Sequence, residues 1–243
     1  MLLSLDRAIV VFVNGYAHRA WSLDALVHFL TSDPLLKGGL MMTVFAYVWF
    51  QAEPHQETFE ITDRRRVLLH SLLICIPALM LARGLGYLFP FRTRPLYEPA
   101  LNLHRAFTFD ANSLETWSSF PSDHAVLFFA LATGVFLVSR RTGVFLYAYT
   151  VIGICLPRVY MGLHYPSDIL AGAVLGVAAG YTARWSGLRS LLTRPALHLH
   201  DVSPGLFYAS FFFLAYQTAD LYDPLRGGFR IATEVLESWI GRS

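Results

Sequence analysis

The sequence predicts an all-α integral membrane protein: a bundle of about six transmembrane helices preceded by amphipathic helices at the membrane interface. Three observations support this class. Of the 243 residues, 55% are hydrophobic, only 15% are charged, and the mean hydropathy is +0.45. A soluble domain has about 25% charged residues, and so apolar a chain cannot stay disordered in water. The length fits one domain, so residues 1–243 are expected to form a single unit.

Residues 1–33 are interpreted as two short amphipathic helices. In the first, Leu5, Ile9 and Phe12 recur at helical spacing, and the polar residues occupy other positions. The second begins near Ser22 and repeats the pattern. Such helices suit the membrane interface, and packing against the bundle is an equal alternative.

Six apolar segments follow, each compared with the roughly 20 residues that a helix needs to cross a bilayer. They are residues 35–50, 67–89, 125–138, 144–159, 169–185 and 206–221. The fifth contains small residues at Gly172, Gly176 and Gly180, which suits close contact with another helix. His198 and His200 are placed in a polar connection, and residues 222–243 are expected to form a peripheral segment.

The remaining composition argues against several functional classes. The formal charge is only +2, and no basic cluster is interleaved with aromatic residues, so nucleic acid is not an expected partner. Cys75 and Cys155 both lie in apolar stretches. We interpret them as small buried residues rather than as a disulfide or metal ligands.

Ionisable residues at membrane depth are costly and tend to mark function. Three clusters qualify: Arg83 with Arg92 and Arg94; Pro121-Ser122-Asp123-His124; and Arg158, His164 and Asp168. When six helices run alternately up and down, all three clusters lie on the same face of the membrane. The sequence therefore predicts one site at that face.

The basic part of this set indicates an anion-binding site. Arg94 and Arg158 cannot lose their charge, and a helix N-terminus adds backbone amides that favour a phosphate-like anion. Ser122 adds a hydroxyl donor near the same N-terminus. No metal and no other cofactor is needed to neutralise the charge.

The histidines indicate what happens to that anion. One histidine, such as His164, can act as a nucleophile. Asp168, four residues later, can accept a proton from its ring and fix the tautomer. His124 can then protonate a leaving oxygen. The predicted chemistry is phosphoryl transfer through a phosphohistidine.

These residues resemble the motifs of the type 2 phosphatidic acid phosphatase family, whose members share a core with vanadium-dependent haloperoxidases. Arg94-Pro95 matches the second half of the first motif, and Pro121-Ser122-Asp123-His124 resembles the second, Pro-Ser-Gly-His. The third motif is matched by Arg158, His164 and Asp168 with both spacings intact. The resemblance covers about residues 83–185, the expected catalytic core.

The resemblance implies a role for each matched residue. His164 would be the nucleophile, Asp168 its orienting partner and His124 the general acid. The residues implied to bind phosphoryl oxygens are Arg94, Arg158, Ser122 and Asp123, the last through its backbone amide. The implied protein is a metal-independent six-helix membrane enzyme of the bacterial cytoplasmic (inner) membrane, with its site facing the periplasm.

Three positions depart from the family pattern. Tyr87 stands where the first motif has a lysine, so Arg83 or Arg92 is a candidate for the missing cation. Pro157 replaces a serine. Asp123 replaces a glycine and puts a carboxylate beside an anion site, which is unfavourable unless the carboxylate pairs with an arginine or points away.

The Pro-Ser-Asp-His variant resembles the bacterial undecaprenyl diphosphate phosphatases of this family. The expected reaction is therefore hydrolysis of undecaprenyl diphosphate to undecaprenyl phosphate and phosphate in the cell envelope. Alternatives within the class are a phosphatase of phosphatidate, phosphatidylglycerol phosphate or lipid A, and a lipid phosphotransferase. A different class, a transporter of an anionic lipid without turnover, also fits the two arginines.

Overall fold

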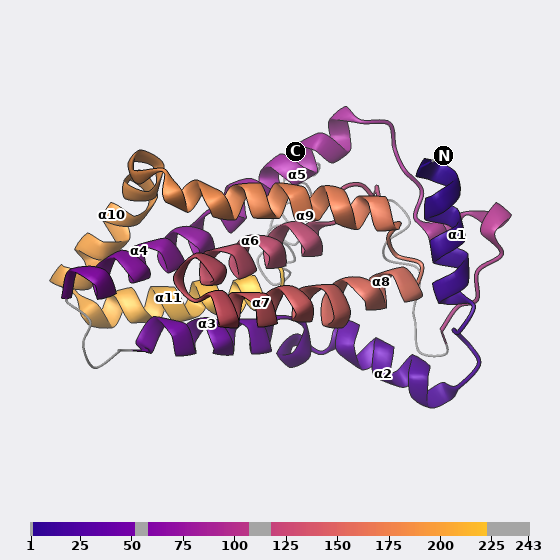
Figure 1. The fold of residues 1–243 in the computed structure, drawn as a ribbon, viewed down its shortest axis with the longest axis horizontal. Coiled ribbons are helices and arrows are strands. Elements are labelled where there is room, and N and C mark those ends of the chain that lie inside the picture. Colours follow the sequence, from indigo (N-terminus) through magenta and orange to yellow (C-terminus); the bar gives the residue numbers. More distant parts are fainter. Residues whose placement is uncertain (1, 52–57, 107–117, 223–243) are drawn as a thin grey trace, which may run out of the picture.

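The computed structural model describes residues 2–51, 58–106 and 118–222, and the all-α prediction is confirmed because no strand occurs among them (Figure 1). The α-helices are α1 (Leu2–Asn14), α2 (Trp21–Ser32), α3 (Leu40–Phe50), α4 (Thr58–Leu73), α5 (Cys75–Leu88), α6 (Asp123–Val138), α7 (Arg140–Tyr149), α8 (Leu156–Tyr160), α9 (Pro166–Tyr181), α10 (Ser186–Val202) and α11 (Pro204–Ala219). Two π-helical segments, Leu35–Gly39 and Thr150–Cys155, lead into α3 and α8. Short 3₁₀ segments are Pro95–Tyr97, Pro99–Leu101 and Thr182–Arg184.

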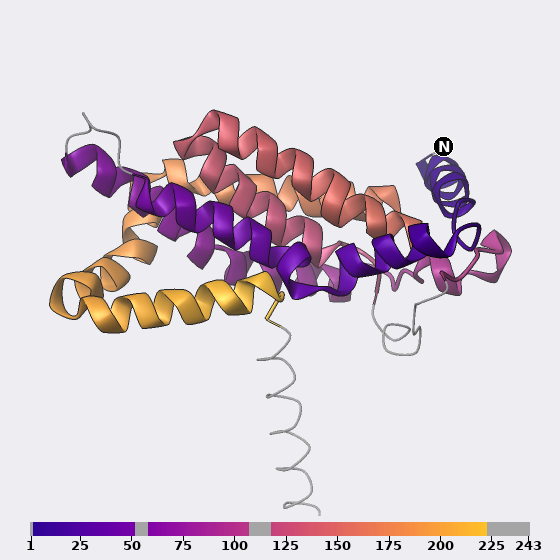
Figure 2. The same ribbon diagram turned by 90° about the horizontal axis from the view of Figure 1, so that it is seen from below.

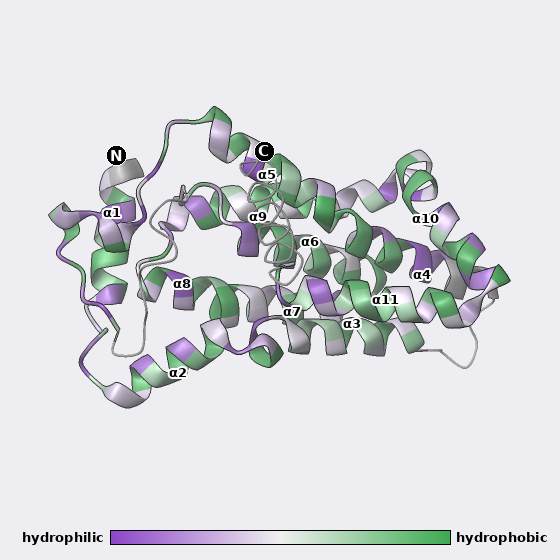
Figure 3. Cartoon of the chain, turned by 180° about the vertical axis from the view of Figure 1, so that it is seen from behind, coloured by the Kyte–Doolittle hydropathy of each residue, from purple (hydrophilic) through white to green (hydrophobic). Residues whose placement is uncertain are grey.

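Most of the helices lie along one long axis, and α1 lies across one end of the bundle (Figures 1 and 2). Helix α6 is the central element, since nearly all its residues from Ala125 to Val135 are buried. Around it packs a core that includes Phe45, Leu72, Leu146 and Phe207, from α3, α4, α7 and α11. Hydrophobic residues predominate along the middle of the bundle (Figure 3). A helix that is apolar on all sides must be enclosed in this way.

Helices α6 and α9 run parallel and touch along a row of glycines. A Cβ atom at Gly172 would lie 2.5 Å from the Ser122 carbonyl oxygen, and one at Gly176 would lie 2.4 Å from that of Val126. At Gly180 it would lie 2.5 Å from the Thr133 Cβ. The predicted close contact is thus confirmed, and because the helices are parallel, both begin at the same end of the molecule.

Two helical segments are long and apolar enough to cross a membrane. They are Asp63–Leu88, with 26 residues, and Arg140–Tyr160, with 21. Shorter apolar helices occupy Leu35–Phe50 and Asp123–Val138. Six full-length spans are not established in the described part of the chain, because helices such as α9 and α11, with 16 residues each, are shorter than the roughly 20 residues of a typical span.

The prediction that His198 and His200 lie in a polar connection is wrong, because both residues lie in helix α10. Pro195 lies inside this helix, and a proline there usually argues against helix formation. Packing against α4 and α11 and a salt bridge from Arg189 to Asp63, at 3.0 Å, hold it in place.

Both N-terminal helices form as predicted, and they pack against the bundle. Asn14 donates from Nδ2 to the Tyr160 carbonyl oxygen at 2.9 Å, and the Tyr160 hydroxyl donates to Asp24 Oδ1 at 2.5 Å. The alternative of bundle packing therefore describes α1 and α2. Of the predicted peripheral segment 222–243, all residues except Tyr222 lie outside the described part of the chain.

Candidate active site

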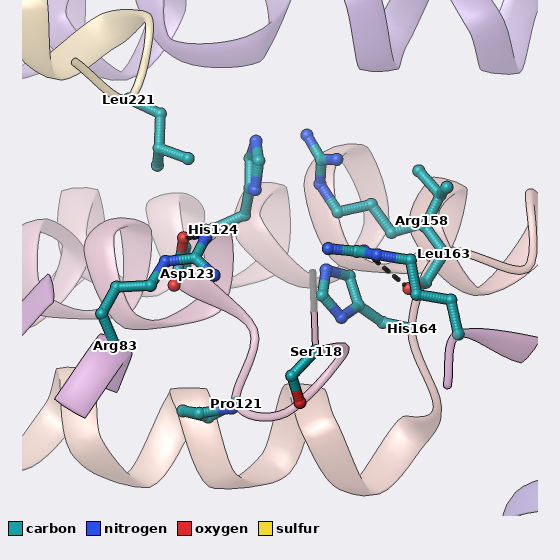
Figure 4. A pocket seen from close by; sticks show the side chains of 10 residues that line it. Arg83, Ser118, Pro121, Asp123, His124, Arg158, Leu163, His164 and Leu221 are labelled. Carbon is teal, nitrogen blue, oxygen red and sulfur yellow. Dashed lines mark hydrogen bonds and ion pairs between the residues drawn. The ribbon is translucent and has the colours of Figure 1, made fainter. Parts of the chain in front are cut away.

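A cavity of about 120 Å³ lies where α5 ends and where α6 and α9 begin. On the same measure a single water needs about 10–15 Å³, so a small anion with several waters fits. Its walls include Arg83, Arg94, Asp123, His124, Arg158 and His164. Figure 4 shows His124, Arg158 and His164 around one space, with Arg83 and Asp123 at its edge. Six of the nine predicted site residues therefore converge.

His164 lies in the turn between α8 and α9 and is 5% exposed. Its Nδ1 is 2.9 Å from the backbone carbonyl oxygen of Ser119. A carbonyl can only accept a hydrogen bond, so this contact assigns the proton to Nδ1 and leaves the lone pair on Nε2. A neutral ring in this tautomer can act as a base or a nucleophile only through Nε2.

Asp168 is completely buried behind His164 and does not line the cavity. Its Oδ2 is 3.8 Å from His164 Nδ1, which is too long for a hydrogen bond. The same oxygen accepts a 2.8 Å bond from the Tyr165 amide and so caps helix α9. The expected hydrogen bond from His164 therefore goes to Ser119, and Asp168 lies close enough to act on the ring through its charge.

Burial lowers the pKa of His164 from 6.5 to about 4. The positive charges of Arg94 and Arg158 lower it further, whereas Asp168 opposes the shift. The unprotonated ring is therefore the form present near pH 7, since desolvation disfavours a charged imidazole.

Two buried arginines face this ring. Arg94 is 6% exposed and Arg158 7%. Arg94 donates from Nη1 to the carbonyl oxygen of Leu163 at 2.9 Å. Leu163 is the residue immediately before His164 in the sequence. Burial lowers the pKa of Arg94, opposed by the charge of Asp168, and a guanidinium stays charged even so. Both predicted anion-binding arginines thus line the cavity.

The start of α6 supplies further polar groups. Ser122 is fully buried, and within the described residues its Oγ has no hydrogen-bond partner. An unpaired buried hydroxyl is costly, and a ligand oxygen would satisfy it. Asp123 accepts a hydrogen bond from Arg83 Nη2. The sequence allowed this carboxylate either to pair with an arginine or to point away from the cavity, and the structure shows the pairing.

Arg92 does not line the cavity. Its guanidinium bonds Asp168 Oδ1 at 2.5 Å and Asp6 Oδ2 at 2.8 Å, and it covers the ring of Tyr165 at 4.2 Å. Two carboxylates hold this side chain away from the cavity. Arg83, which does line the cavity, is therefore the candidate that remains for the missing lysine.

Two contributors were missed by sequence reasoning. One is Asp6, which lies among the polar residues of the first amphipathic helix. Its only signal was a charged residue interrupting an apolar run. Ser119 acts through its backbone carbonyl, which no side-chain pattern can reveal.

The described part of the chain contains no group of three or more His, Cys, Asp or Glu residues that could hold a metal ion. Cys75 and Cys155 are buried and unbonded to each other. The positive charge in the cavity comes from arginines.

Comparison with known families gives a match over residues 89–190 to the PAP2 superfamily. This segment belongs to the PAP2 superfamily. It includes Arg94, the Pro121–His124 motif and the third cluster from Arg158 to Asp168. The matched segment therefore contains both histidines of the cavity and all of its arginines except Arg83.

Three curated relatives extend the comparison. The chain is 25% identical to the bacitracin transport permease protein BcrC of Bacillus licheniformis, over 78% of this chain and 84% of the relative. It is 25% identical to the putative undecaprenyl-diphosphatase YbjG of Escherichia coli, over 76% and 83%. A decaprenylphosphoryl-5-phosphoribose phosphatase of Mycobacterium tuberculosis is 42% identical over 62 residues, which is 26% of this chain and 33% of the relative. No solved structure matches the chain significantly. The matched segment and the named relatives together support a phosphatase, a hydrolase.

Proposed function

We propose that this PAP2 protein is a membrane lipid phosphatase that hydrolyses undecaprenyl diphosphate to undecaprenyl phosphate and phosphate. One observation supports the reaction above all: three arginines and two histidines line a single cavity, and Nδ1 of His164 is bonded to Ser119. The name of the Escherichia coli relative supports the polyprenyl diphosphate. The low charged fraction suits an enzyme whose substrate stays in the bilayer.

In the first step, Nε2 of His164 attacks the terminal phosphorus. The bond from that phosphorus to the bridging oxygen breaks, and His124 gives its proton to the leaving lipid phosphate. Arg94 and Arg158 hold the phosphoryl oxygens as charge develops. The imidazole becomes positive when the N–P bond forms, and Asp168 at 3.8 Å stabilises that charge.

In the second step, water attacks the phosphohistidine. His124, now neutral, takes the proton from water, and the N–P bond breaks to release inorganic phosphate. The ring of His164 returns to its neutral form with Nδ1 still bonded to Ser119. Both steps use protein groups alone, without a metal or other cofactor.

The arrangement of arginines suits a bundle that crosses the bacterial cytoplasmic membrane with its site at the periplasmic face. Arginines near the helix ends opposite the cavity are Arg64, Arg65, Arg66, Arg140, Arg141, Arg184 and Arg189. An excess of arginine on one side marks the cytoplasm. At the cavity end, Arg83 and Arg92 bind carboxylates and Arg94 and Arg158 line the cavity, so these four arginines do not count against this bias.

Labelling in intact cells tests the orientation. A membrane-impermeant maleimide should label Ala100→Cys at the cavity end and leave Ser186→Cys at the other end unlabelled until the cells are opened. Both positions are exposed, and Cys75 and Cys155 are buried. The reverse labelling pattern would invert the proposed topology.

The reaction is tested by phosphate release from undecaprenyl diphosphate, phosphatidate, phosphatidylglycerol phosphate and lipid A, using the full chain in detergent. The parent should prefer the first substrate. His164→Ala should lose activity by at least about 1000-fold, and a label from the terminal phosphate should be trapped on the parent alone. His198→Ala in α10 is the matched control and should behave like the parent. Full activity of His164→Ala would exclude the phosphohistidine.

The permease name of the Bacillus licheniformis relative favours one second candidate, movement of an anionic lipid without turnover. Flux of a labelled lipid across vesicles, with no phosphate released from any substrate of the panel, would support transport and overturn the phosphatase. Phosphate transferred to an added alcohol in place of water would instead identify a phosphotransferase.

A further inference from the structure

A chain of alternating charges lies behind His164 and reaches helix α1. Asp6 of α1 contacts Arg92, at 2.8 Å between Oδ2 and Nη2. Arg92 contacts Asp168 on its other side, at 2.5 Å between Nη1 and Oδ1. Asp168 lies 3.8 Å from the ring of His164. Negative, positive and negative side chains therefore follow one another from α1 to the ring of His164.

These charged groups form a buried network and not a surface ion pair. Asp6 is 5% exposed and Asp168 is completely buried. Besides Arg92, Asp6 also accepts hydrogen bonds from the Ser167 amide, at 3.0 Å, and from the Ser167 hydroxyl. Arg92 donates to the same hydroxyl oxygen at 2.8 Å. Asp6 is thus fixed to the first turn of α9 by two donors of Ser167 and to the loop after α5 by Arg92.

Each link determines the position of the next. Arg92 holds Oδ1 of Asp168, so Oδ2 remains on the Tyr165 amide and near the imidazole. Asp6 in turn holds Arg92 by one nitrogen while the other binds Asp168. A guanidinium can bridge two carboxylates because its donors form a rigid fork. Without Asp6, Arg92 loses the partner that fixes its orientation.

We propose that Asp6 and Arg92 are positioning residues for phosphoryl transfer at His164, and that α1 is thereby part of the active site. The kinetic part of this inference rests on the proposed function; the electrostatic part does not. Asp6 lies outside the segment matched to the PAP2 superfamily.

The two residues carry opposite charges, and this gives a signature that loss of packing cannot imitate. The charged and titratable groups around His164 are Arg94, Arg158 and Asp168 next to it, Arg92 and Asp6 behind Asp168, and Arg83, Asp123 and His124 across the cavity. Neutralising Arg92 leaves excess negative charge near the ring and favours the imidazolium. Neutralising Asp6 does the opposite.

The test is an NMR pH titration of the imidazole-labelled full chain in detergent, with the His164 signal assigned by its loss in His164→Gln. Arg92→Met should raise the midpoint and Asp6→Asn should lower it. Each shift should be roughly 0.3 to 1.2 pH units, the range for one charge about 10 Å away at an effective dielectric constant from 80 to 20. The double variant should return close to the parent midpoint.

Two further variants separate charge from geometry. Arg92→Lys keeps the charge but cannot bridge both carboxylates, so its midpoint should stay near the parent value. Asp63→Asn, which breaks the comparable pair with Arg189 at the far end, should not move it. Shifts of the same sign in Arg92→Met and Asp6→Asn, or no shift in either, would overturn the inference.

Kinetics supply the second readout. Asp6→Asn and Arg92→Lys should lower kcat by about 10-fold to 100-fold, the cost of a small misplacement of a reacting group. KM should change little, because neither residue lines the cavity. Parent-like kcat in both variants would refute a positioning role. If the parent itself releases no phosphate, the proposed function fails, and the titration still decides the electrostatic part.

Discussion

The Nδ1 atom of His164 lies 2.9 Å from the backbone carbonyl oxygen of Ser119, and that bond orients the ring. The Ser119 amide donates in turn to the Arg92 carbonyl oxygen at 2.9 Å. The segment before α6 is therefore tied to the loop after α5 on one side and to the histidine on the other. Because the acceptor is a main-chain atom, no side-chain substitution removes it directly.

Stability should depend on pH through His164. Its pKa is near 6.5 in the unfolded chain and about 4 in the fold, so the unfolded state binds more protons between these values. Stability should therefore fall as pH drops from 6.5 to 4, by at most about 3 kcal/mol. Thermal unfolding of the parent and His164→Gln across this range measures it. Equal pH slopes in the two proteins would contradict the prediction, and His198→Gln should keep the parent slope.

The pairing of Arg83 with Asp123 should matter for substrate binding. Arg83→Met leaves a buried carboxylate unpaired beside the anion, and KM should rise about 10-fold because repulsion adds to the loss of a cation. Asp123→Gly in the same background should recover much of this loss. A double-mutant cycle on KM measures the coupling; additive effects would show that the pair does not act as a unit.

Gly176 should not tolerate a side chain. A Cβ atom there would lie 2.4 Å from the Val126 carbonyl oxygen, so Gly176→Ala must push α9 away from α6. We expect a loss of about 1–3 kcal/mol, as for other overpacked interiors, seen as a lower Tm together with reduced phosphate release. Gly187→Ala in α10, where no atom lies within 4 Å, is the control. A parent-like Tm in Gly176→Ala would argue against the close contact.

Removal of divalent cations should leave the enzyme active. Arg94 and Arg158 already supply two fixed positive charges to the cavity, which is the role that a metal plays in other phosphoryl-transfer sites. After dialysis against EDTA, phosphate release in chelator-containing buffer should stay within about twofold of the untreated enzyme. A loss that added Mg²⁺ or Mn²⁺ restores would show that the arginines are not sufficient.

The helical class and most of the polar residues that line the cavity could be predicted from the sequence, because both rest on local patterns. Apolar length indicated the helices, and fixed spacing linked Arg158, His164 and Asp168. The glycine spacing in 172–180 likewise predicted a contact that the structure confirms. These features depend on residues close together in the chain.

What sequence reasoning missed depends on distant contacts. Arg92 looked like a phosphate ligand because it is close to Arg94 in the chain, yet Asp6, 86 residues away, holds it elsewhere. His198 and His200 were placed in a polar connection, whereas helix α10 forms there because tertiary packing outweighs the local preference of Pro195. The acceptor for His164 was assigned to the carboxylate four residues later, and a backbone carbonyl 45 residues earlier takes the bond.

The row of glycines between α6 and α9 determines the spacing of two histidines, and it does so without using the side chains that shape the rest of the cavity. His124 follows the start of α6 and His164 precedes the start of α9, and where the two helices meet, glycines bring their backbones into contact. The spacing between these two histidines is therefore set largely by main-chain contact. A substitution of a side chain elsewhere around the cavity can therefore change which headgroup fits without changing the distance between His124 and His164.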